Sequence, residues 1–465
     1  MRDRKQATGV GGQGLSRRQL LRGAAAAAAF TIVPRHVLGG KGRKAPSEKL
    51  NVAGVGLGVM GCENLQNCGE NVVAVCDVDW RLAAEGFKRF PKAAKYRDYR
   101  RMLDKQRSID AVVVATPDHT HAVITAEAIR RSKHVYTQAP LAHDVWEARE
   151  LVRLAREAGV VTQMGNERHS GPDIRKACEY IWSGTLGAVR EVHCWTNRPQ
   201  WPQGMGRPKD TPARPAKLAW DLWLGPAARR GYHPAYHPCN WRGWVDFGTG
   251  ALGAMGCHIL DAAFWALRLG QANSFTVEAS STGTNGQTWP KASTVRYKFP
   301  ARGNMPPVTV TWFDGGRRPP RPPELPKTRE HVGSNGTFFL GEKCKMALGA
   351  LIAGTRAGQA GPRLMPESMM TAKGPKQTIP RVKFDRTMWV QRSRHELEWV
   401  AACKKGRQPC SSFAESGPLT EMVLLGNVAL LAGKPIEWDC KKMKIVNEPA
   451  ANKHLRREYR DGWKL

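Results

Sequence analysis

Residues 50–77 read LNVAGVGLGVMGCENLQNCGENVVAVCD, and they carry the most specific structural motif of the chain. The apolar run over 50–55 predicts a buried strand, which leads directly into Gly56-x-Gly58-x-x-Gly61 and then a helix. Gly56 permits a tight turn, Gly58 lets a ligand approach the backbone, and Gly61 allows close helix packing. A helix that begins in such a turn points its free N–H groups at an anion, so the stretch predicts a phosphate cradle.

The acid at the end of this stretch predicts which ligand the cradle holds. Asp77 closes a second apolar run over 72–76, about 20 residues after the first glycine. At that position a carboxylate accepts a hydrogen bond from a ribose 2′-hydroxyl, which identifies a Rossmann domain that binds a dinucleotide. The negative charge favours NAD over NADP, whose 2′-phosphate it would repel. Arg81 lies close enough in sequence to keep NADP as an alternative.

The pattern that follows predicts more of the same domain. A buried strand over 111–115 ends in Thr116-Pro117-Asp118-His119-Thr120-His121, and shorter strands are expected over 135–138 and 160–163. Ligands bind beyond the carboxyl ends of the strands in such a sheet, so the turn from Thr116 to His121 is expected beside the cofactor. We place this domain at 48–165.

After residue 165 the alternation of strands and helices ends. Strands are predicted over 189–195, 294–299 and 308–312, with helices over 173–183 and 258–269. The fold class is therefore an α/β Rossmann domain plus an α+β domain, 166–465, with a largely antiparallel open sheet.

Charge and cysteine content narrow the partners. The chain has a formal charge of +32, but its basic residues are spread out and no nucleic-acid module with interleaved aromatics is present, so no nucleic acid is expected. Its 11 cysteines show neither C-x-x-C pairs nor zinc spacing, so no metal is predicted.

The N-terminus has the pattern of a targeting segment. Ser16-Arg17-Arg18-Gln19-Leu20-Leu21 precedes a short alanine-rich apolar run, and residues 1–40 together resemble a twin-arginine signal peptide. The apolar run is too short for a stable membrane span. We therefore expect export by the twin-arginine route to the periplasm or cell envelope.

Taken in order, these motifs resemble the glucose-fructose oxidoreductase and inositol dehydrogenase family, Gfo/Idh/MocA. The glycine turn, residues 115–121 and the segment 143–151 occur in the family's order, as do Gln163-Met164-Gly165-Asn166 and Asn240-Trp241-Arg242. The resemblance implies an NAD-dependent oxidoreductase that acts on a sugar, polyol or glycoside. It also implies a homo-oligomer, either a dimer or a tetramer.

Two positions depart from the family pattern. The family's E-K-P motif is Gln138-Ala139-Pro140 here, so an alanine replaces the lysine. In Ala254-Met255-Gly256-Cys257-His258 the family's histidine is present as His258, but Ala254 replaces its aspartate. The lysine would stabilise a developing alkoxide and the aspartate would orient the histidine, and a methyl group does neither.

Three accounts follow from these losses. In the first, His258 is the base of a working oxidoreductase, and Asp261, His169 or His237 supplies the missing polar group. Asp261 follows His258 by three residues, so a continuous helix would place both on one face. In the second, the protein binds NAD and sugar with little or no redox turnover. In the third, NAD is recycled internally and the net reaction cleaves a glycoside.

The candidate residues form three groups. The catalytic candidates are His258 and Asp261. The cofactor candidates, several of them implied by the resemblance, are Gly56, Gly58, Val59, Met60, Gly61, Asp77, Thr116, Pro117, His119, His121, Gln138, Pro140, Asn166, Trp241 and Arg242. The substrate candidates are His169, Tyr236, His237 and Asn240.

Overall fold

The apolar runs of the first third of the chain form a six-stranded parallel sheet in the order β3-β2-β1-β4-β5-β6. The computed structural model describes residues 48–324, 333–349, 361–370, 374–381 and 393–465, so the predicted signal segment lies outside the described residues. The strands are β1 (Asn51–Val55), β2 (Asn71–Cys76), β3 (Ala94–Tyr96), β4 (Ala111–Val114), β5 (His134–Gln138) and β6 (Thr162–Gly165). This sheet confirms the predicted Rossmann domain.

Alternate side chains of these strands enter two separate cores. Ala53 and Val112 point into the core under the helices α4, α5 and α6, whereas Val52 and Val113 point into the core under α2 and α11. Both faces are thereby buried, which explains why the strands read as continuous apolar runs rather than alternating ones. The helices of this layer are α2 (Val59–Cys68), α3 (Ala84–Arg89), α4 (Tyr99–Lys105), α5 (Asp118–Arg130), α6 (Val145–Ala158) and α11 (Ser393–Lys405).

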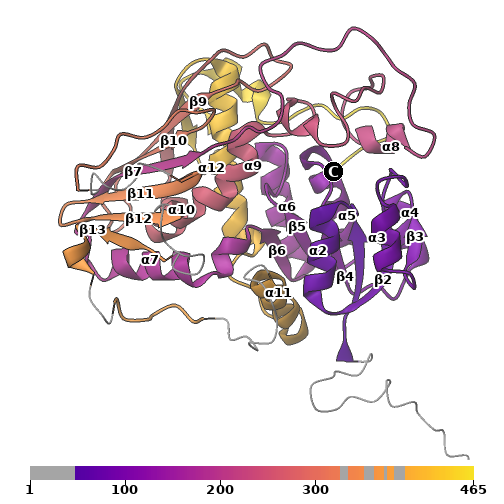
Figure 1. Ribbon diagram of the computed structural model, residues 1–465, viewed down its shortest axis with the longest axis horizontal. Coiled ribbons are helices and arrows are strands. Elements are labelled where there is room, and N and C mark those ends of the chain that lie inside the picture. Colours follow the sequence, from indigo (N-terminus) through magenta and orange to yellow (C-terminus); the bar gives the residue numbers. More distant parts are fainter. Residues whose placement is uncertain (1–47, 325–332, 350–360, 371–373, 382–392) are drawn as a thin grey trace, which may run out of the picture. The chain divides into compact units, whose positions relative to one another are not determined.

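Helix α11 comes from the C-terminal part of the chain but packs on the Rossmann sheet (Figure 1). The Glu396 carboxylate accepts a hydrogen bond from the Asn64 amide at 2.7 Å, and the Trp399 ring packs edge-on against Tyr136. This part of the first domain's core therefore comes from residues far away in the sequence.

In the described part of the chain, the second sheet has nine strands in the order β13-β12-β11-β7-β10-β9-β8-β14-β15. Its pairs are antiparallel except β7 with β10, which are parallel, so the predicted largely antiparallel sheet is confirmed. The strands are β7 (Val189–Thr196), β8 (Ser274–Ser281), β9 (Ser293–Phe299), β10 (Val308–Phe313), β11 (Asn335–Gly341), β12 (Lys345–Gly349), β13 (Arg363–Met365), β14 (Ile436–Asp439) and β15 (Lys444–Ile445).

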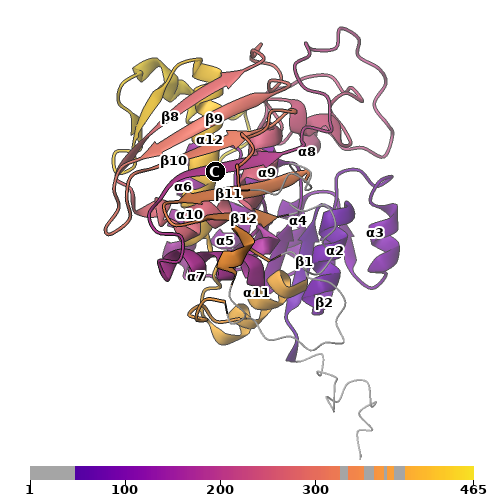
Figure 2. The same ribbon diagram turned by 60° about the vertical axis from the view of Figure 1, so that its left-hand side comes forward.

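Helices lie between this sheet and the Rossmann domain (Figures 1 and 2). They are α7 (Pro172–Trp182), α9 (Gly250–Ile259), α10 (Asp261–Ala266) and the long apolar α12 (Phe413–Ala432), with α8 (Trp220–Leu224) in a loop region. Short 3-10 turns are η2 (Glu167–Ser170), η3 (Asn240–Gly243), η4 (Leu269–Gln271), η5 (Glu367–Met369) and η6 (Pro449–His454). The single helix expected over 258–269 is instead divided after Ile259.

The last residues of the chain return to the first domain. After η6 the C-terminal tail, residues 455–465, runs to a point above α5 in Figure 1. Within the described residues, no helix has the length and apolarity needed to cross a membrane. All the cysteines are unpaired.

Candidate functional site

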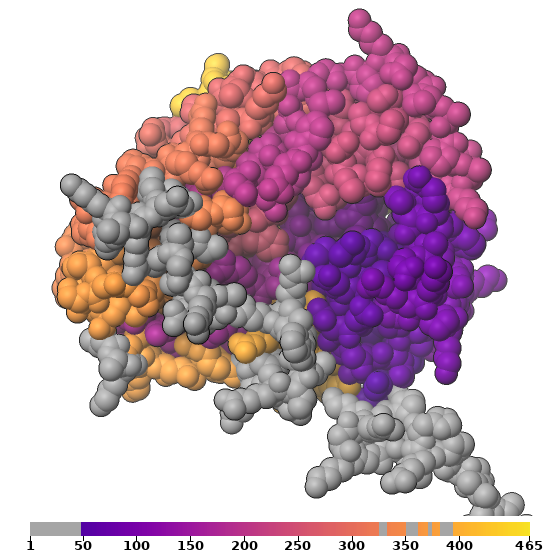
Figure 3. Space-filling view, viewed as in Figure 1, coloured from indigo at the N-terminus to yellow at the C-terminus, as the bar shows by residue number. Residues whose placement is uncertain are grey.

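A cavity of about 1050 Å³ lies at the carboxyl edge of the parallel sheet. The glycine turn, Asp77 and the turn after β4 line one side of it, and residues of η3 and α9 line the other. In the space-filling view the indigo surface of the Rossmann domain borders the pink surface of the later residues that complete this site (Figure 3). The cavity is where the topology predicts a ligand.

The glycine turn has the shape of a phosphate cradle. Gly56 has φ +89°, and a Cβ there would lie 2.5 Å from the Ala115 carbonyl oxygen. A Cβ on Gly61 would lie 1.9 Å from the Gly56 carbonyl oxygen, so the turn and helix α2 pack closely only with glycine. Gly58 caps α2 without a side-chain hydrogen bond, and the space around it is open. Val59 and Met60 complete the lining here, so this part of the chain fits a pyrophosphate.

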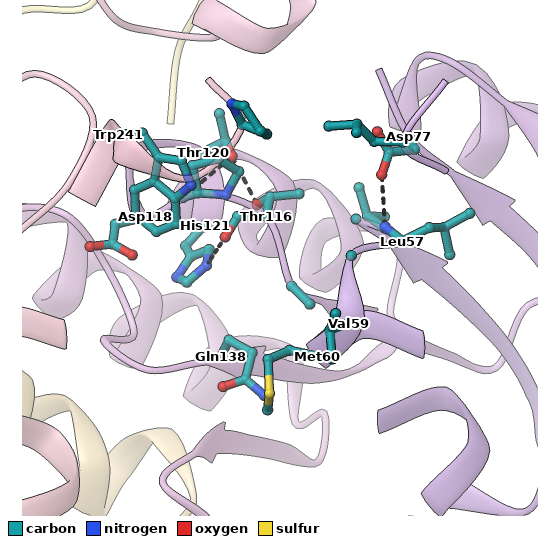
Figure 4. A pocket seen from close by; sticks show the side chains of 18 of the residues that line it. Leu57, Val59, Met60, Asp77, Thr116, Asp118, Thr120, His121, Gln138 and Trp241 are labelled. Atoms are coloured by element: carbon teal, nitrogen blue, oxygen red, sulfur yellow. Dashed lines mark hydrogen bonds between the residues drawn. The ribbon is translucent and has the colours of Figure 1, made fainter. Parts of the chain in front are cut away.

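Asp77 lies at one end of the cavity and is fixed by the backbone (Figure 4). One carboxylate oxygen accepts the Leu57 N–H and the other accepts the Asp79 N–H, both at 2.8 Å. Each oxygen keeps a second lone pair for a ribose hydroxyl. Burial raises the pKa of Asp77 to about 6, because a desolvated carboxylate is costly. Arg81 pairs with Asp79 at 3.2 Å instead of with Asp77.

The turn after β4 divides into residues that reach the cavity and residues that support it. Thr116, Pro117 and His121 line the cavity. His119 does not: it is completely buried, with its ring nitrogens 3.1 and 2.8 Å from the carbonyl oxygens of Phe247 and Trp223. Predicting a cofactor contact for His119 was therefore wrong, because the helical turn of α5 points this ring into the core.

The segment after β5 also divides. Gln138 lines the cavity and donates to the Asn64 side chain at 2.8 Å, and Ala139 lines it too. Pro140 is outside the lining, and its carbonyl oxygen lies 2.8 Å from Nδ1 of His121. Pro140 therefore supports the turn after β4 and, contrary to the prediction, does not contact the cavity.

His258 faces the cavity from α9, and its partner is a residue that the sequence did not suggest. Its Nδ1 lies 3.5 Å from a carboxylate oxygen of Glu167, and both side chains are about one-fifth exposed. Ala139 and Ala254 line the same cavity. Glu167 follows β6 directly after Asn166, so its position at the carboxyl end of a strand was the available signal.

Asp261 does not pair with His258. Both of its carboxylate oxygens accept from Nδ1 of His169, at 2.9 and 3.0 Å, and the His169 ring stacks on Trp265. The expected pairing was wrong because α9 ends at Ile259, so the three-residue spacing does not share one helical face.

The His169–Asp261 pair lies at a second cavity of about 690 Å³, together with Asn166. The Asn166 side-chain oxygen accepts from the Ser411 hydroxyl at 2.5 Å, and the side chain is almost completely buried. The described residues that line the first cavity do not include His169, Asp261 or Asn166. The structure therefore does not support His169 as a substrate contact, Asn166 as a cofactor contact or Asp261 as a catalytic residue.

The segment before α9 brings further residues to the cofactor cavity. His237 lines it, and its Nε2 lies 2.9 Å from a carboxylate oxygen of Asp79, which ties this segment to the Rossmann domain. Asn240, Trp241 and Arg242 also line the cavity, with the Arg242 guanidinium 4.3 Å from the Trp241 ring centroid.

Tyr236, in contrast, is a core residue. It packs edge-on against Trp244 and Phe247 with only 5% of its surface exposed, outside the cavity lining, so predicting it as a substrate contact was wrong.

Sequence reasoning also missed several residues that do line the cavity: Arg97, Tyr99, Arg198, Gln200, Trp201 and Trp463. In the described part of the chain, no group of His, Cys, Asp and Glu side chains is arranged to hold a metal ion.

Comparison with known proteins places both domains in one family. Residues 50–166 match the family model described as an oxidoreductase family, NAD-binding Rossmann fold, and residues 188–301 match that family's C-terminal alpha/beta domain. The first match makes this part of the chain a Rossmann domain for a nicotinamide cofactor.

Individual relatives agree with this. Inositol 2-dehydrogenase from Rubrobacter xylanophilus is 33% identical over 155 residues, which are 32% of this chain and 44% of that protein. Levoglucosan dehydrogenase from Pseudarthrobacter phenanthrenivorans is 28% identical over 115 residues, 25% of this chain and 29% of that protein. These matches therefore span less than half the length of either relative.

The fold has a solved counterpart over most of the chain. The structure of GenD2 from gentamicin A biosynthesis, in complex with NAD, matches with a TM-score of 0.56 and 19% identity, over 88% of this chain and all of that one. With both domain models matched in order and the two-domain fold shared, the chain belongs to the Gfo/Idh/MocA oxidoreductase family.

Proposed function

We propose that this protein is an NAD-dependent oxidoreductase that acts on a sugar, polyol or glycoside, with His258 as its base and Glu167 as the carboxylate that partners it. The observation that carries the proposal is the 3.5 Å contact between these two side chains in the cofactor cavity. The contact supplies an acid-base pair in the cavity that Ala139 and Ala254 also line. At these two positions the chain lacks the charged groups of the family pattern.

Each residue of the pair has a role in the reaction. His258 takes the proton of the substrate hydroxyl as the carbonyl forms, and it becomes an imidazolium. The Glu167 carboxylate stabilises that imidazolium and fixes the ring's orientation through Nδ1, which leaves Nε2 for the substrate. When bound, NAD would accept the hydride from the substrate carbon that carries this hydroxyl.

Other cavity residues suit a polyhydroxy substrate. Gln200 and Asn240 offer amides that both donate and accept, Arg198 and Arg242 donate, and Trp201 offers an aromatic face. Hydroxyl groups need both donors and acceptors, so this lining favours a carbohydrate over an apolar compound.

The choice of NAD over NADP rests on Asp77. Its carboxylate is held by two backbone N–H groups at the cavity wall, while Arg81 is engaged with Asp79. In this arrangement a ribose 2′-hydroxyl gains an acceptor, and a 2′-phosphate meets a negative charge.

The experiment that tests the activity uses purified protein loaded with NAD. The absorbance of reduced nicotinamide is recorded after addition of a panel of sugars, polyols and glycosides. A rise with at least one compound, lost in His258→Ala while NAD still binds, is the expected result. If NAD and a sugar bind but no absorbance change or product appears, the protein is a binding protein without redox turnover.

The panel also tests glycoside cleavage through internally recycled NAD. That reaction would release a sugar from a glycoside without net accumulation of reduced nicotinamide.

We further propose export by the twin-arginine route to the periplasm or envelope, tested by fractionation of cells that carry Arg17→Lys and Arg18→Lys. A homo-oligomer is proposed as well, tested by light scattering.

A further inference from the structure

The cofactor cavity has two chemically distinct ends, and the sheet order places them. Glu167 and Ala139 follow β6 and β5 on one side of the glycine turn, whereas Asp77 and Tyr99 follow β2 and β3 on the other. His258 faces the first end. On the proposed function, a dinucleotide with its pyrophosphate at the glycine turn directs its nicotinamide to the first end and its adenosine to the second.

The second end contains a residue from the last three positions of the chain. Trp463 lines the cavity together with Asp98 and Tyr99, and its ring is half-buried. The Arg100 guanidinium lies 4.7 Å from the Trp463 ring centroid, and Arg100 is itself held by Asp98 through a two-pronged ion pair at 2.9 to 3.2 Å. The Arg460 guanidinium of the tail lies 5.7 Å from the same centroid, so both the Rossmann domain and the tail position the indole.

The C-terminal tail is fixed at several points before it reaches the cavity. Arg457 donates to Glu147 and to the His119 carbonyl oxygen, both at 2.6 Å. Arg460 donates to the carbonyl oxygens of Gly225 at 2.6 Å and Asp221 at 2.7 Å. These contacts join the tail to the Rossmann domain and to the α8 region, so the position of Trp463 is built into the fold.

We propose that Trp463 is a cofactor-binding residue that forms an aromatic wall for the adenine end of the NAD site. An indole at this place offers a flat π-face to a purine base, an interaction that depends on no hydrogen bond. The tail's fixed contacts pre-organise that face, so little ordering is left to binding. The inference rests on the proposed NAD site and adds a residue outside the segments that match the family's two domain models, 50–166 and 188–301.

The test is calorimetric binding of NAD, ADP-ribose and nicotinamide mononucleotide to the purified protein and to Trp463→Ala. Loss of one base stack weakens NAD and ADP-ribose by about ten- to a hundredfold. Nicotinamide mononucleotide lacks the adenine, so its binding is expected to stay unchanged. Trp463→Phe keeps an aromatic face and is expected to recover most of the affinity.

Trp146→Ala is the matched control. Trp146 is also half-buried and also stacks with an arginine of the tail, since the Arg456 guanidinium lies 3.9 Å from its ring centroid, but it does not line the cavity. This variant is expected to bind all three ligands as the wild type does.

Any of four results would overturn the inference. If Trp463→Ala binds NAD as tightly as the wild type, Trp463 does not contribute to binding of the adenine base. If that variant weakens all three ligands alike, or Trp146→Ala matches it, the tail acts only on folding. If the wild type binds neither NAD nor ADP-ribose, the proposed function falls too, which distinguishes that failure from the first.

Discussion

The carboxylate of Glu167 lies 3.5 Å from Nδ1 of His258, in the cavity that is also lined by the alanines that replace the family's lysine and aspartate. A carboxylate at Nδ1 orients the imidazole and stabilises its cationic form. Glu167→Gln keeps the size but removes the charge, so we expect kcat to fall by about 10- to 100-fold with little change in KM. Initial rates on the best substrate of the panel measure this.

Asp261 provides the comparison for Glu167. Asp261→Asn changes a carboxylate of the same region that pairs with His169 at the second cavity. If Asp261→Asn lowers kcat as much as Glu167→Gln does in a variant that remains folded, Glu167 has no special role. A wild-type rate in Glu167→Gln would have the same meaning.

Alanine substitutions at two glycines of the cradle should affect different properties, namely the stability of the protein and its affinity for NAD. A Cβ on Gly61 would lie 1.9 Å from a backbone oxygen, so Gly61→Ala is expected to lose about 1–3 kcal/mol or more of stability. Gly58 has φ −66° and open space, so Gly58→Ala should unfold at the wild-type temperature. Its new methyl group stands where the ligand approaches, so NAD should bind at least about tenfold more weakly.

Thermal unfolding and NAD titration of the two variants, side by side, check this pair. A stable Gly61→Ala protein would contradict the close packing of the turn on α2. Unchanged NAD affinity in Gly58→Ala would contradict the placement of the pyrophosphate.

The pKa of Asp77 predicts how NAD binding depends on pH. Burial raises it from 3.8 to about 6, so the free protein favours the neutral acid below pH 6. For folding, a raised pKa means that the stabilising contribution of this group is complete below 3.8 and is lost as the pH rises through 6. For binding the direction is opposite, because the ribose needs the ionised acceptor. NAD should bind about tenfold more weakly at pH 5 than at neutral pH.

Asp77→Asn is the control for this titration. It removes the ionisable group, so the pH dependence of NAD affinity should flatten and discrimination against NADP should shrink. Titrations of both cofactors at several pH values measure the effect. An unchanged slope in Asp77→Asn would assign the pH dependence to another group.

The sequence predicts those parts of the site whose geometry is local. Gly56, Gly58, Gly61 and Asp77 lie within one strand-turn-helix-strand unit, so their spacing alone places them at the carboxyl edge of the sheet.

The sequence fails where contacts between distant segments decide the position. Asp261 does not pair with His258, because helix α9 ends at Ile259. Its carboxylate accepts a hydrogen bond from His169, which lies far away in the sequence. Tyr236 and His119 enter one aromatic core around Phe247, which no local pattern shows. Trp463 lies at the cavity at the end of a tail whose Arg457 and Arg460 bind Glu147 and Asp221 on other elements.

Arg457, whose side chain is 16% exposed, gives a test of how the tail is held. It is enclosed between Glu147 and Asp144, and these carboxylates raise its pKa against the effect of burial. Burial and the Glu147 charge in turn raise the pKa of Asp144 well above its ordinary value. Arg457→Ala leaves two buried acids without their cation, so we expect a loss of about 3–5 kcal/mol in the free energy of unfolding, measured in urea.

The double variant Arg457→Met with Glu147→Gln separates the ion pair from simple packing. Replacing both partners by neutral side chains of similar size removes the unpaired charge, so this protein should be more stable than Arg457→Met alone. Arg456→Ala, which removes only a stack on Trp146 at 3.9 Å, should cost far less than Arg457→Ala. If the two alanine variants lose equal stability, or the double variant is the least stable of all, the buried pair does not hold the tail. The position of Trp463 would then need another explanation.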